Sequence, residues 1–169
     1  NKDQAQAFLG VSFRDKLLIP DFDVIDQLTF FSMIKGSTLV ETLHEVDIYM
    51  SAMKLKPWKH TLTKNLSVGY RNILAVCCAL IGDSKIIILD DPTIGLDSPT
   101  RIMLSNLLFR EKKHRTIIMS SHNLDDVDLL ADRVGVMMKG ELTSFGSCYF
   151  LKSVHGMGHR LVSRIISTL

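Results

Sequence analysis

The stretch that decides the fold is residues 85–97, which read KIIILDDPTIGLD. Its first half is a short run of β-branched and aliphatic residues, and such a run between turn signals is typical of a buried strand. Two carboxylates, Asp90 and Asp91, follow the run directly. A carboxylate at the end of a buried strand is costly unless it is paired or binds a cation. The structural alternative is that one acid only begins the turn at Pro92 and the other only caps it.

Strands and helices are expected to alternate along the rest of the chain. The expected strands and helices are 8–13, 24–34, 38–55, 68–81, 102–113, 116–119, 123–131 and, over 133–145, a hairpin or two consecutive strands. The helix 38–55 is expected to carry an apolar stripe formed by Val40, Leu43, Val46 and Met50. This alternation favours an α/β domain with a mostly parallel sheet, in which ligands bind beyond the carboxyl ends of the strands. The residues that directly follow the strands, Asp90, Asp91 and Ser120–His122, are therefore the first candidates for a site.

Composition excludes several other classes of protein. The 169 residues allow about one domain, and 20 Lys and Arg against 18 Asp and Glu give a formal charge of only +2. That balance is too mild to predict a nucleic-acid partner. Three cysteines, two of them adjacent, do not make a disulfide framework, and a reducing compartment is expected. The longest apolar stretch, residues 73–81, is too short to cross a bilayer.

Four short motifs follow one another in a specific order. Residues 66–70 read LSVGY, residues 86–90 form the strand that ends in an acid, residues 92–97 read PTIGLD, and His122 follows the next strand. This order resembles the nucleotide-binding domain of ATP-binding cassette (ABC) proteins. In the resemblance these motifs correspond to the LSGGQ signature, Walker B, the segment that ends in the D-loop, and the switch histidine.

Further segments resemble subfamily A of the ABC transporters, whose members move lipids. These segments are residues 28–36, 79–85, 115–120, 128–133 and 150–158. Within residues 79–85, the sequence GDSK is more similar to the first of that family's two cassettes than to the second. The resemblance covers roughly residues 9–160.

The resemblance implies the fold class and the boundaries. The fold is α/β, a P-loop NTPase-like parallel sheet layered with helices, plus a small helical subdomain at about residues 24–82. Residues 1–160 would be the C-terminal portion of one cassette, without its N-terminal strands and P-loop, and residues 161–169 a tail. The first residue is Asn1 rather than Met, so we expect that the chain lacks its natural start.

The resemblance also implies a catalytic centre at the strand ends. Asp90 would bind Mg²⁺ through water, Asp91 would stand at the position of the catalytic carboxylate, and His122 would sense the γ-phosphate of ATP through a ring N–H. A lone histidine at a strand end is more often only a satisfied polar group, and the order of the motifs is what favours the catalytic interpretation.

A second set of residues would serve the partner cassette. Ser67, Val68 and Gly69 would contact ATP held by that cassette, because a hydroxyl and backbone amides at a helix N-terminus form an anion site. Asp97 would contact the partner cassette itself. Ser67 and Asp97 can each also be a plain helix cap, and the two interpretations do not exclude each other.

Departures from the family pattern weaken the catalytic prediction. No GxxxxGK[ST] occurs in the 169 residues, so no such loop cradles the phosphates. Arg14 stands where the Q-loop glutamine is expected, and an arginine has no acceptor for a metal or a water. Asp91 replaces the usual glutamate and is one methylene shorter; a misplacement of about 1 Å can cost roughly 10²-fold in rate. Val68 and Tyr70 depart from the signature.

Two functions remain open from the sequence. The first is an ATP-binding and ATP-hydrolysing cassette, on the cytoplasmic face of a membrane transporter that moves lipids or lipid-like substrates. ATP and Mg²⁺ would be its cofactors, and a second cassette and the transmembrane domains its partners. ATP hydrolysis is expected only in the full-length protein, and the 169-residue chain alone is expected to be inactive. The second is a degenerate cassette that serves as a structural or regulatory binding module for a partner cassette.

Overall fold

The computed structural model describes residues 9–13 and 17–155. The chain divides into two compact units, residues 1–124 and 125–169, and each is described here by itself. Within the described part of the chain, no helix is long and apolar enough to span a membrane.

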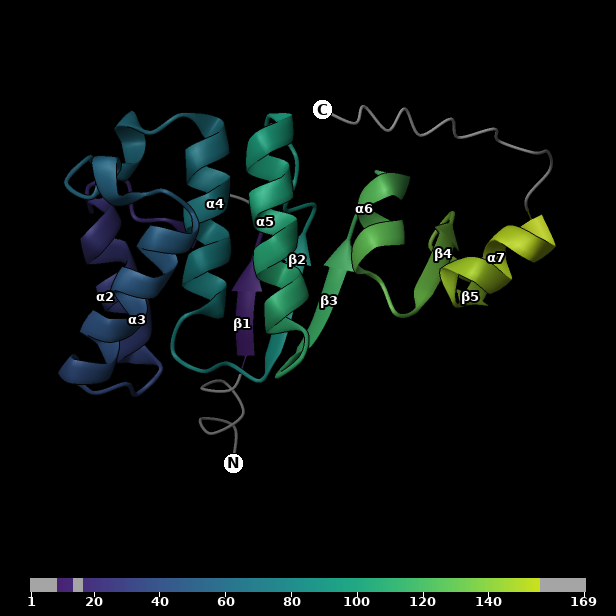
Figure 1. The fold of residues 1–169 in the computed structure, drawn as a ribbon, viewed down its shortest axis with the longest axis horizontal. Coiled ribbons are helices and arrows are strands. Elements are labelled where there is room, and N and C mark those ends of the chain that lie inside the picture. Colours follow the sequence, from purple (N-terminus) through teal and green to yellow (C-terminus); the bar gives the residue numbers. More distant parts are fainter. Residues whose placement is uncertain (1–8, 14–16, 156–169) are drawn as a thin grey trace, which may run out of the picture. The chain divides into compact units, whose positions relative to one another are not determined.

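The first unit is built on a three-stranded parallel sheet. Its strands are β1 (Leu9–Ser12), β2 (Ile86–Asp90) and β3 (Thr116–Ser120), in the order β1-β2-β3. Both neighbouring pairs are parallel, and Figure 1 shows all three strands among the helices of this unit. The α/β class expected from the sequence is therefore confirmed, with each strand within two residues of its predicted bounds.

The two faces of this sheet differ in burial. Gly10 and Ile87 lie on the buried face, against which the helix α4 (Val68–Leu80) packs. The approach is close at Gly10, where an added Cβ would lie 1.9 Å from the carbonyl oxygen of Ala79. On the other face, Ile86 is 44% and Ile118 56% exposed. The buried face thus fixes α4 to the sheet that ends in the two acids.

Two further helices pack beside α4. Helices α2 (Val24–Ile34) and α3 (Leu39–Ala52) contact each other, and α2 also contacts α4. Asp23 caps α2, and Thr38 forms a capping box with Glu41 at the start of α3. Such caps satisfy backbone donors that have no partner within the helix. Two short 3₁₀ turns, η2 (Lys56–Trp58) and η3 (Thr63–Asn65), then lead to α4.

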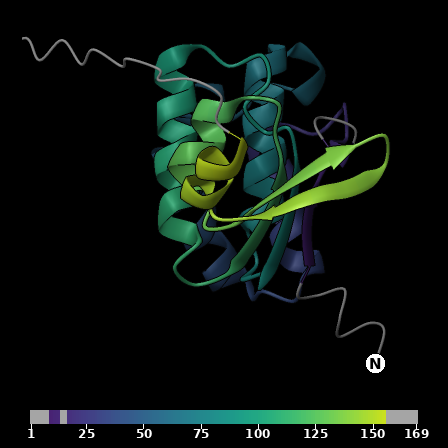
Figure 2. The ribbon, with the colours of Figure 1, turned by 90° about the vertical axis from the view of Figure 1, so that its right-hand side faces the viewer.

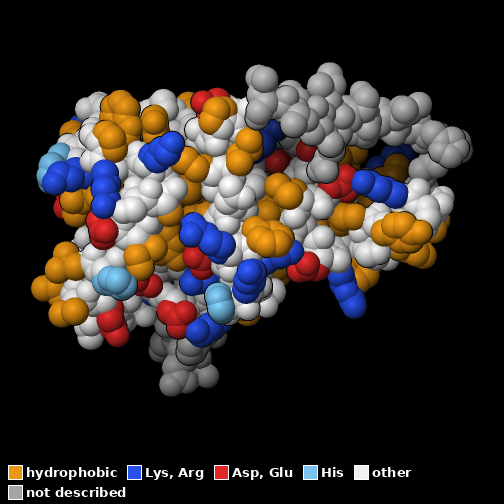
Figure 3. All heavy atoms as spheres, viewed as in Figure 1, with side chains coloured by type: hydrophobic (Ala, Val, Ile, Leu, Met, Phe, Trp, Pro, Cys, Tyr) orange, Lys and Arg blue, Asp and Glu red, His pale blue; other side chains and the backbone are white. Residues whose placement is uncertain are grey.

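The prediction for the second of these helices needs correction. It ends at Ala52, not at Leu55, and its predicted apolar stripe is only partly buried. Val40 and Leu43 are 78% and 59% exposed. They form an exposed patch together with three neighbours, Met33, Ile34 and Leu39, and apolar side chains gather at this end of the two helices in Figure 3. The buried face of α3 is instead formed by Thr42, Val46, Tyr49 and Met50.

The helix predicted at 102–113 begins four residues earlier. Helix α5 covers Ser98–Glu111, with Asp97 as its N-cap and a proline in its first turn. Proline is favoured there because its missing N–H and fixed φ suit the start of a helix. The sequence prediction placed these residues in the preceding loop and so started the helix too late.

The second unit consists of an antiparallel hairpin and two helices. Helix α6 (Leu124–Leu130) is followed by β4 (Val134–Met138), β5 (Glu141–Gly146) and α7 (Cys148–His155). The hairpin predicted over 133–145 is confirmed and is seen clearly in Figure 2. Its turn places Lys139 and Gly140 at positive φ, which suits a two-residue hairpin turn.

The adjacent thiols in α4 make stability depend on pH. Burial raises the pKa of Cys77 to about 12 and that of Cys78 well above its ordinary value. An unfolded thiol loses its proton near pH 8.5, whereas the buried thiols keep theirs, so stability is lost as the pH rises above about 8.5. The loss should approach about 1.4 kcal/mol per pH unit for each thiol.

Urea unfolding at pH 8 and pH 10 should show this loss of stability, and the double variant Cys77→Ala, Cys78→Ala should lose less stability across this range. An equal loss in the variant would contradict the prediction.

Candidate functional site

The carboxyl end of β2 holds the two predicted acids, and Ser120 connects them. Asp90 pairs with Ser120 in the register of β2 and β3. The Ser120 hydroxyl donates to Asp90 Oδ1 at 2.7 Å and accepts from the Asp91 backbone N–H at 3.0 Å. The sequence pointed to Ser120 as a residue at a strand end but gave it no role. The structure assigns it the role of orienting Asp90.

Asp91 and His122, predicted to form the catalytic centre, are in direct contact. His122 Nδ1 lies 2.9 Å from Asp91 Oδ2. The Asp91 side chain is 11% exposed and the His122 side chain is 70% exposed. A buried carboxylate is therefore in contact with a solvent-exposed imidazole. Asp91 adopts φ +50°, the left-handed region that aspartate tolerates better than most residues. The pair is therefore fixed on one side and accessible to a ligand on the other.

The N-terminus of α4 lies beside the loop that follows the acids. An added Cβ on Gly69 would lie 3.2 Å from the Gly95 carbonyl oxygen, and the Asn72 side-chain amide donates to the Ile94 carbonyl at 2.8 Å. Asn72 was missed by the sequence reasoning, and its only signal was a polar residue directly before the apolar run 73–81. The predicted signature segment and the segment after Walker B thus form one local unit.

The predicted helix caps are observed at both residues. The Ser67 hydroxyl accepts from the Tyr70 backbone N–H at 3.3 Å, and Asp97 Oδ1 accepts from the Thr100 backbone N–H at 3.1 Å. Hydrogen bonds to Thr100 hold the pKa of the Asp97 carboxyl below its usual value. Ser67, Val68 and Asp97 are exposed. The capping roles are confirmed, and the contacts with ATP and with a partner cassette stay predictions.

The remaining parts of the predicted site are Arg14 and the cation. Arg14 lies outside the described residues. Over residues 9–13 and 17–155, no group of three or more His, Cys, Asp or Glu side chains gathers in the way a metal cluster would require. A Mg²⁺ ion commonly takes only one or two carboxylates and keeps its waters and phosphate ligands. The exposed Asp90 carboxylate, oriented by Ser120, suits that kind of binding.

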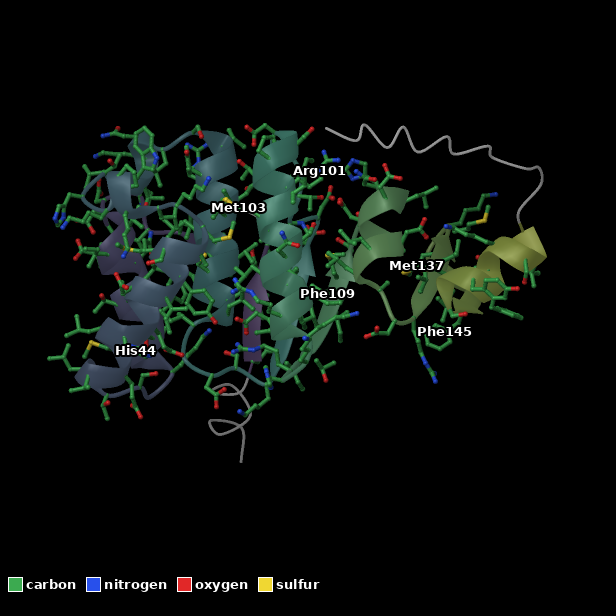
Figure 4. The ribbon with its side chains drawn as sticks, viewed as in Figure 1. His44, Arg101, Met103, Phe109, Met137 and Phe145 are labelled. Carbon is green, nitrogen blue, oxygen red and sulfur yellow. The ribbon has the colours of Figure 1, made fainter. Side chains whose placement is uncertain are left out.

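A shallow cavity of about 220 Å³ lies beside the first turns of α4 and α5. Its lining includes Lys54, Tyr70, Met103 and Asn106, and Figure 4 shows Met103 between the two helices. None of the predicted site residues lines it. The predicted site residues therefore lie apart from this cavity.

Comparison with known sequences gives consistent matches. The family model described as ABC transporter matches residues 1–94. Human ATP-binding cassette sub-family A member 2 is 35% identical over 159 residues, which are 94% of this chain and 6% of that protein. Human phospholipid-transporting ATPase ABCA3 is 35% identical over 158 residues, 94% of this chain and 9% of that protein. The chain thus spans less than a tenth of the length of these relatives.

Solved structures agree on the fold. An ATP-binding subunit of an ABC transporter matches with a TM-score of 0.83 at 17% identity, over 92% of this chain and 65% of that chain. A dimeric ATP-binding cassette in a post-hydrolysis state, bound to ADP and Pi, matches with a TM-score of 0.76 at 20% identity, over 85% of this chain and 65% of that chain. At these identities the likeness is one of fold alone.

Proposed function

The chain belongs to the ABC transporter family and is similar to its sub-family A, and from this premise we propose that it forms part of an ATP-hydrolysing cassette. The cassette would belong to a longer membrane transporter that moves lipids or lipid-like substrates, with ATP bound at an interface with a second cassette. The names of the relatives, one of them a phospholipid-transporting ATPase, support the substrate class. The cassette would then lie on the cytoplasmic face of the membrane.

The observation that carries the proposal is the contact between Asp91 and His122 at the end of β2. A buried carboxylate beside an exposed imidazole is a suitable arrangement for general-base and phosphate-sensing chemistry. If Nδ1–H donates to Asp91, the other ring nitrogen donates to a phosphate only when the ring is protonated. In this proposal the same carboxylate acts on the attacking water, with one oxygen in contact with His122 and only 11% of the side chain exposed.

Asp90 is the residue that would hold the cation. Its carboxylate is exposed, and Ser120 fixes one of its oxygens. When bound, Mg²⁺ neutralises charge on the phosphates. Ser120 also accepts from the Asp91 backbone N–H, so it links the Asp90 carboxylate to the Asp91 backbone at the end of β2.

The first turn of α4 would meet ATP held by the partner cassette. Ser67 and Gly69 stand at a helix N-terminus, where backbone N–H groups and the helix dipole favour an anion. The dimeric cassette bound to ADP and Pi that shares this fold supports a two-cassette arrangement. Asp97, exposed at the start of α5, would contact the second cassette.

One observation favours the alternative of a binding module that hydrolyses nothing. Tyr70, a departure from the signature, packs its ring against Trp58, with centroids 5.2 Å apart. This departure therefore has a structural role. Together with Asp91 and Val68, it is what a degenerate cassette would carry while an active partner cassette keeps one composite site working.

Replacing Ser67 by alanine tests the proposal. In the full-length transporter we expect Ser67→Ala to lower ATP turnover at least ~10-fold, because a hydrogen bond to a charged group is worth about 1.5–3 kcal/mol. Thr38→Ala is the matched control, since it also removes an N-cap, worth about 1 kcal/mol, but on α3. A steady-state phosphate-release assay measures both. Equal turnover in the two variants would contradict the proposed contact between Ser67 and ATP held by the partner cassette.

A further inference from the structure

A lysine from another helix holds the C-terminal end of α4. Lys35 follows the last residue of α2, and its ammonium donates to the carbonyls of Cys78 and Ala79 at 2.9 Å and of Ile81 at 2.7 Å. The last four carbonyls of a helix have no partner within the helix. One side chain thus satisfies three carbonyls at the end of α4, 43 to 46 residues away in sequence.

Two other groups complete this junction. Glu45, on α3, accepts from the Gly82 backbone N–H at 3.0 Å and from the Ser32 hydroxyl at 3.3 Å through the same oxygen. Arg115 donates to the Leu80 carbonyl at 2.7 Å and pairs with Glu111 of α5 at 3.0 Å. The end of α4 is therefore bonded to α2, to α3 and to the segment before β3.

We propose that Lys35 is a positioning residue, which couples the arm formed by α2 and α3 to α4. A movement of this arm would be transmitted along α4 to the first turn of α4. Helix α4 is continuous over 13 residues, or about 20 Å, and Ser67 and Gly69 stand at its other end. The coupling itself depends only on the contacts described above, and its meaning for ATP turnover rests on the proposed function.

The charge of Lys35 makes this junction sensitive to pH. Burial lowers the pKa of Lys35 to about 8; Cys78 and Glu45 act to raise it and Arg115 to lower it. A lysine released into water has a pKa of about 10.4. Since the docked ammonium binds its proton more weakly than the released one, the junction strengthens as the pH rises from about 8 to about 10.4, and it opens more easily at neutral pH.

The wild-type chain tests this directly. In a titration followed by the NMR signal of the lysine Cε carbon, the Lys35 resonance should have its midpoint near pH 8. Its loss in Lys35→Met assigns it. A midpoint at about 10.4, the ordinary value of lysine, would overturn the pH dependence of the junction, while the coupling itself is tested by the variants below.

Two matched pairs of variants test the coupling. An added Cβ on Gly82 would lie 2.8 Å from Lys35 Cδ, whereas one on Gly36 would meet nothing within 4 Å, and both glycines have positive φ. Gly82→Ala should therefore loosen the junction, and Gly36→Ala should add only backbone strain. In the same way, Lys35→Met is compared with Lys54→Met, which changes an exposed lysine just after α3.

Amide hydrogen exchange at pH 7 gives the readout. In Lys35→Met and Gly82→Ala, the Ile81 and Gly82 amides should exchange at least ~10-fold faster than in the controls, and so should the Tyr70 amide at the opposite end of α4. Faster exchange at Ile81 and Gly82 alone would overturn the coupling. Because no nucleotide is present, this result stands apart from the proposed function, which fails separately if Ser67→Ala leaves turnover unchanged.

Discussion

Gly10→Ala is expected to destabilise the chain by more than about 3 kcal/mol. The added Cβ would lie 1.9 Å from the Ala79 carbonyl oxygen, a backbone atom, and 2.7 Å from Ile87 Cδ1. Overpacking of a core usually costs about 1–3 kcal/mol. Rotation of the Ile87 side chain cannot relieve the clash with the backbone oxygen of Ala79, so α4 itself must move away from β1. The Ala79 carbonyl also accepts from Lys35, so the shift would disturb both sides of the helix at once.

Urea unfolding followed by circular dichroism measures this effect. Gly36→Ala is the control, since its Cβ meets nothing within 4 Å and only its φ of +97° is unfavourable. We expect the control to cost about 1–2 kcal/mol. If the two variants are equally stable, the close packing of α4 on β1 is wrong.

Much of the fold follows from local signals. The helix Val24–Ile34 was predicted with its observed bounds, because its apolar spacing is clear and Lys35 and Gly36 mark its end. The strand before Asp90 was placed correctly for a similar reason, since β-branched residues are followed directly by acids. In both cases the deciding residues lie next to each other in the chain.

The parts that escaped prediction depend on residues that are distant in sequence. Ser120 orients Asp90 only because β2 and β3 pair in a register that places the two residues opposite each other. Lys35 resembles any lysine before a glycine until α2 is docked against the end of α4. Val40 fits an apolar stripe by spacing, but the tertiary packing of α3 turns a neighbouring face inward. Local pattern carries no information on such choices.

Asp91→Asn is expected to lower ATP turnover in the full-length transporter by at least ~100-fold. The substitution keeps the size of the side chain and its reach toward His122, 2.9 Å from Oδ2 in the wild type, but removes the negative charge. A general base that loses its charge typically loses 10²- to 10⁴-fold in rate. Stability should change little by comparison, so circular dichroism and nucleotide binding would separate lost chemistry from lost folding.

The companion variant decides between the two functions. Asp91→Glu restores the charge and adds the methylene that the family's usual residue has, so turnover should be kept or raised if Asp91 acts on the attacking water. The extra methylene has to fit where Asp91 is only 8% exposed. Asp47→Asn controls for the change of acid to amide, since Asp47 is exposed and pairs with Lys56 at 2.7 Å. Unchanged turnover in both Asp91 variants would mean that this strand end does no chemistry, and the cassette would then act through binding alone.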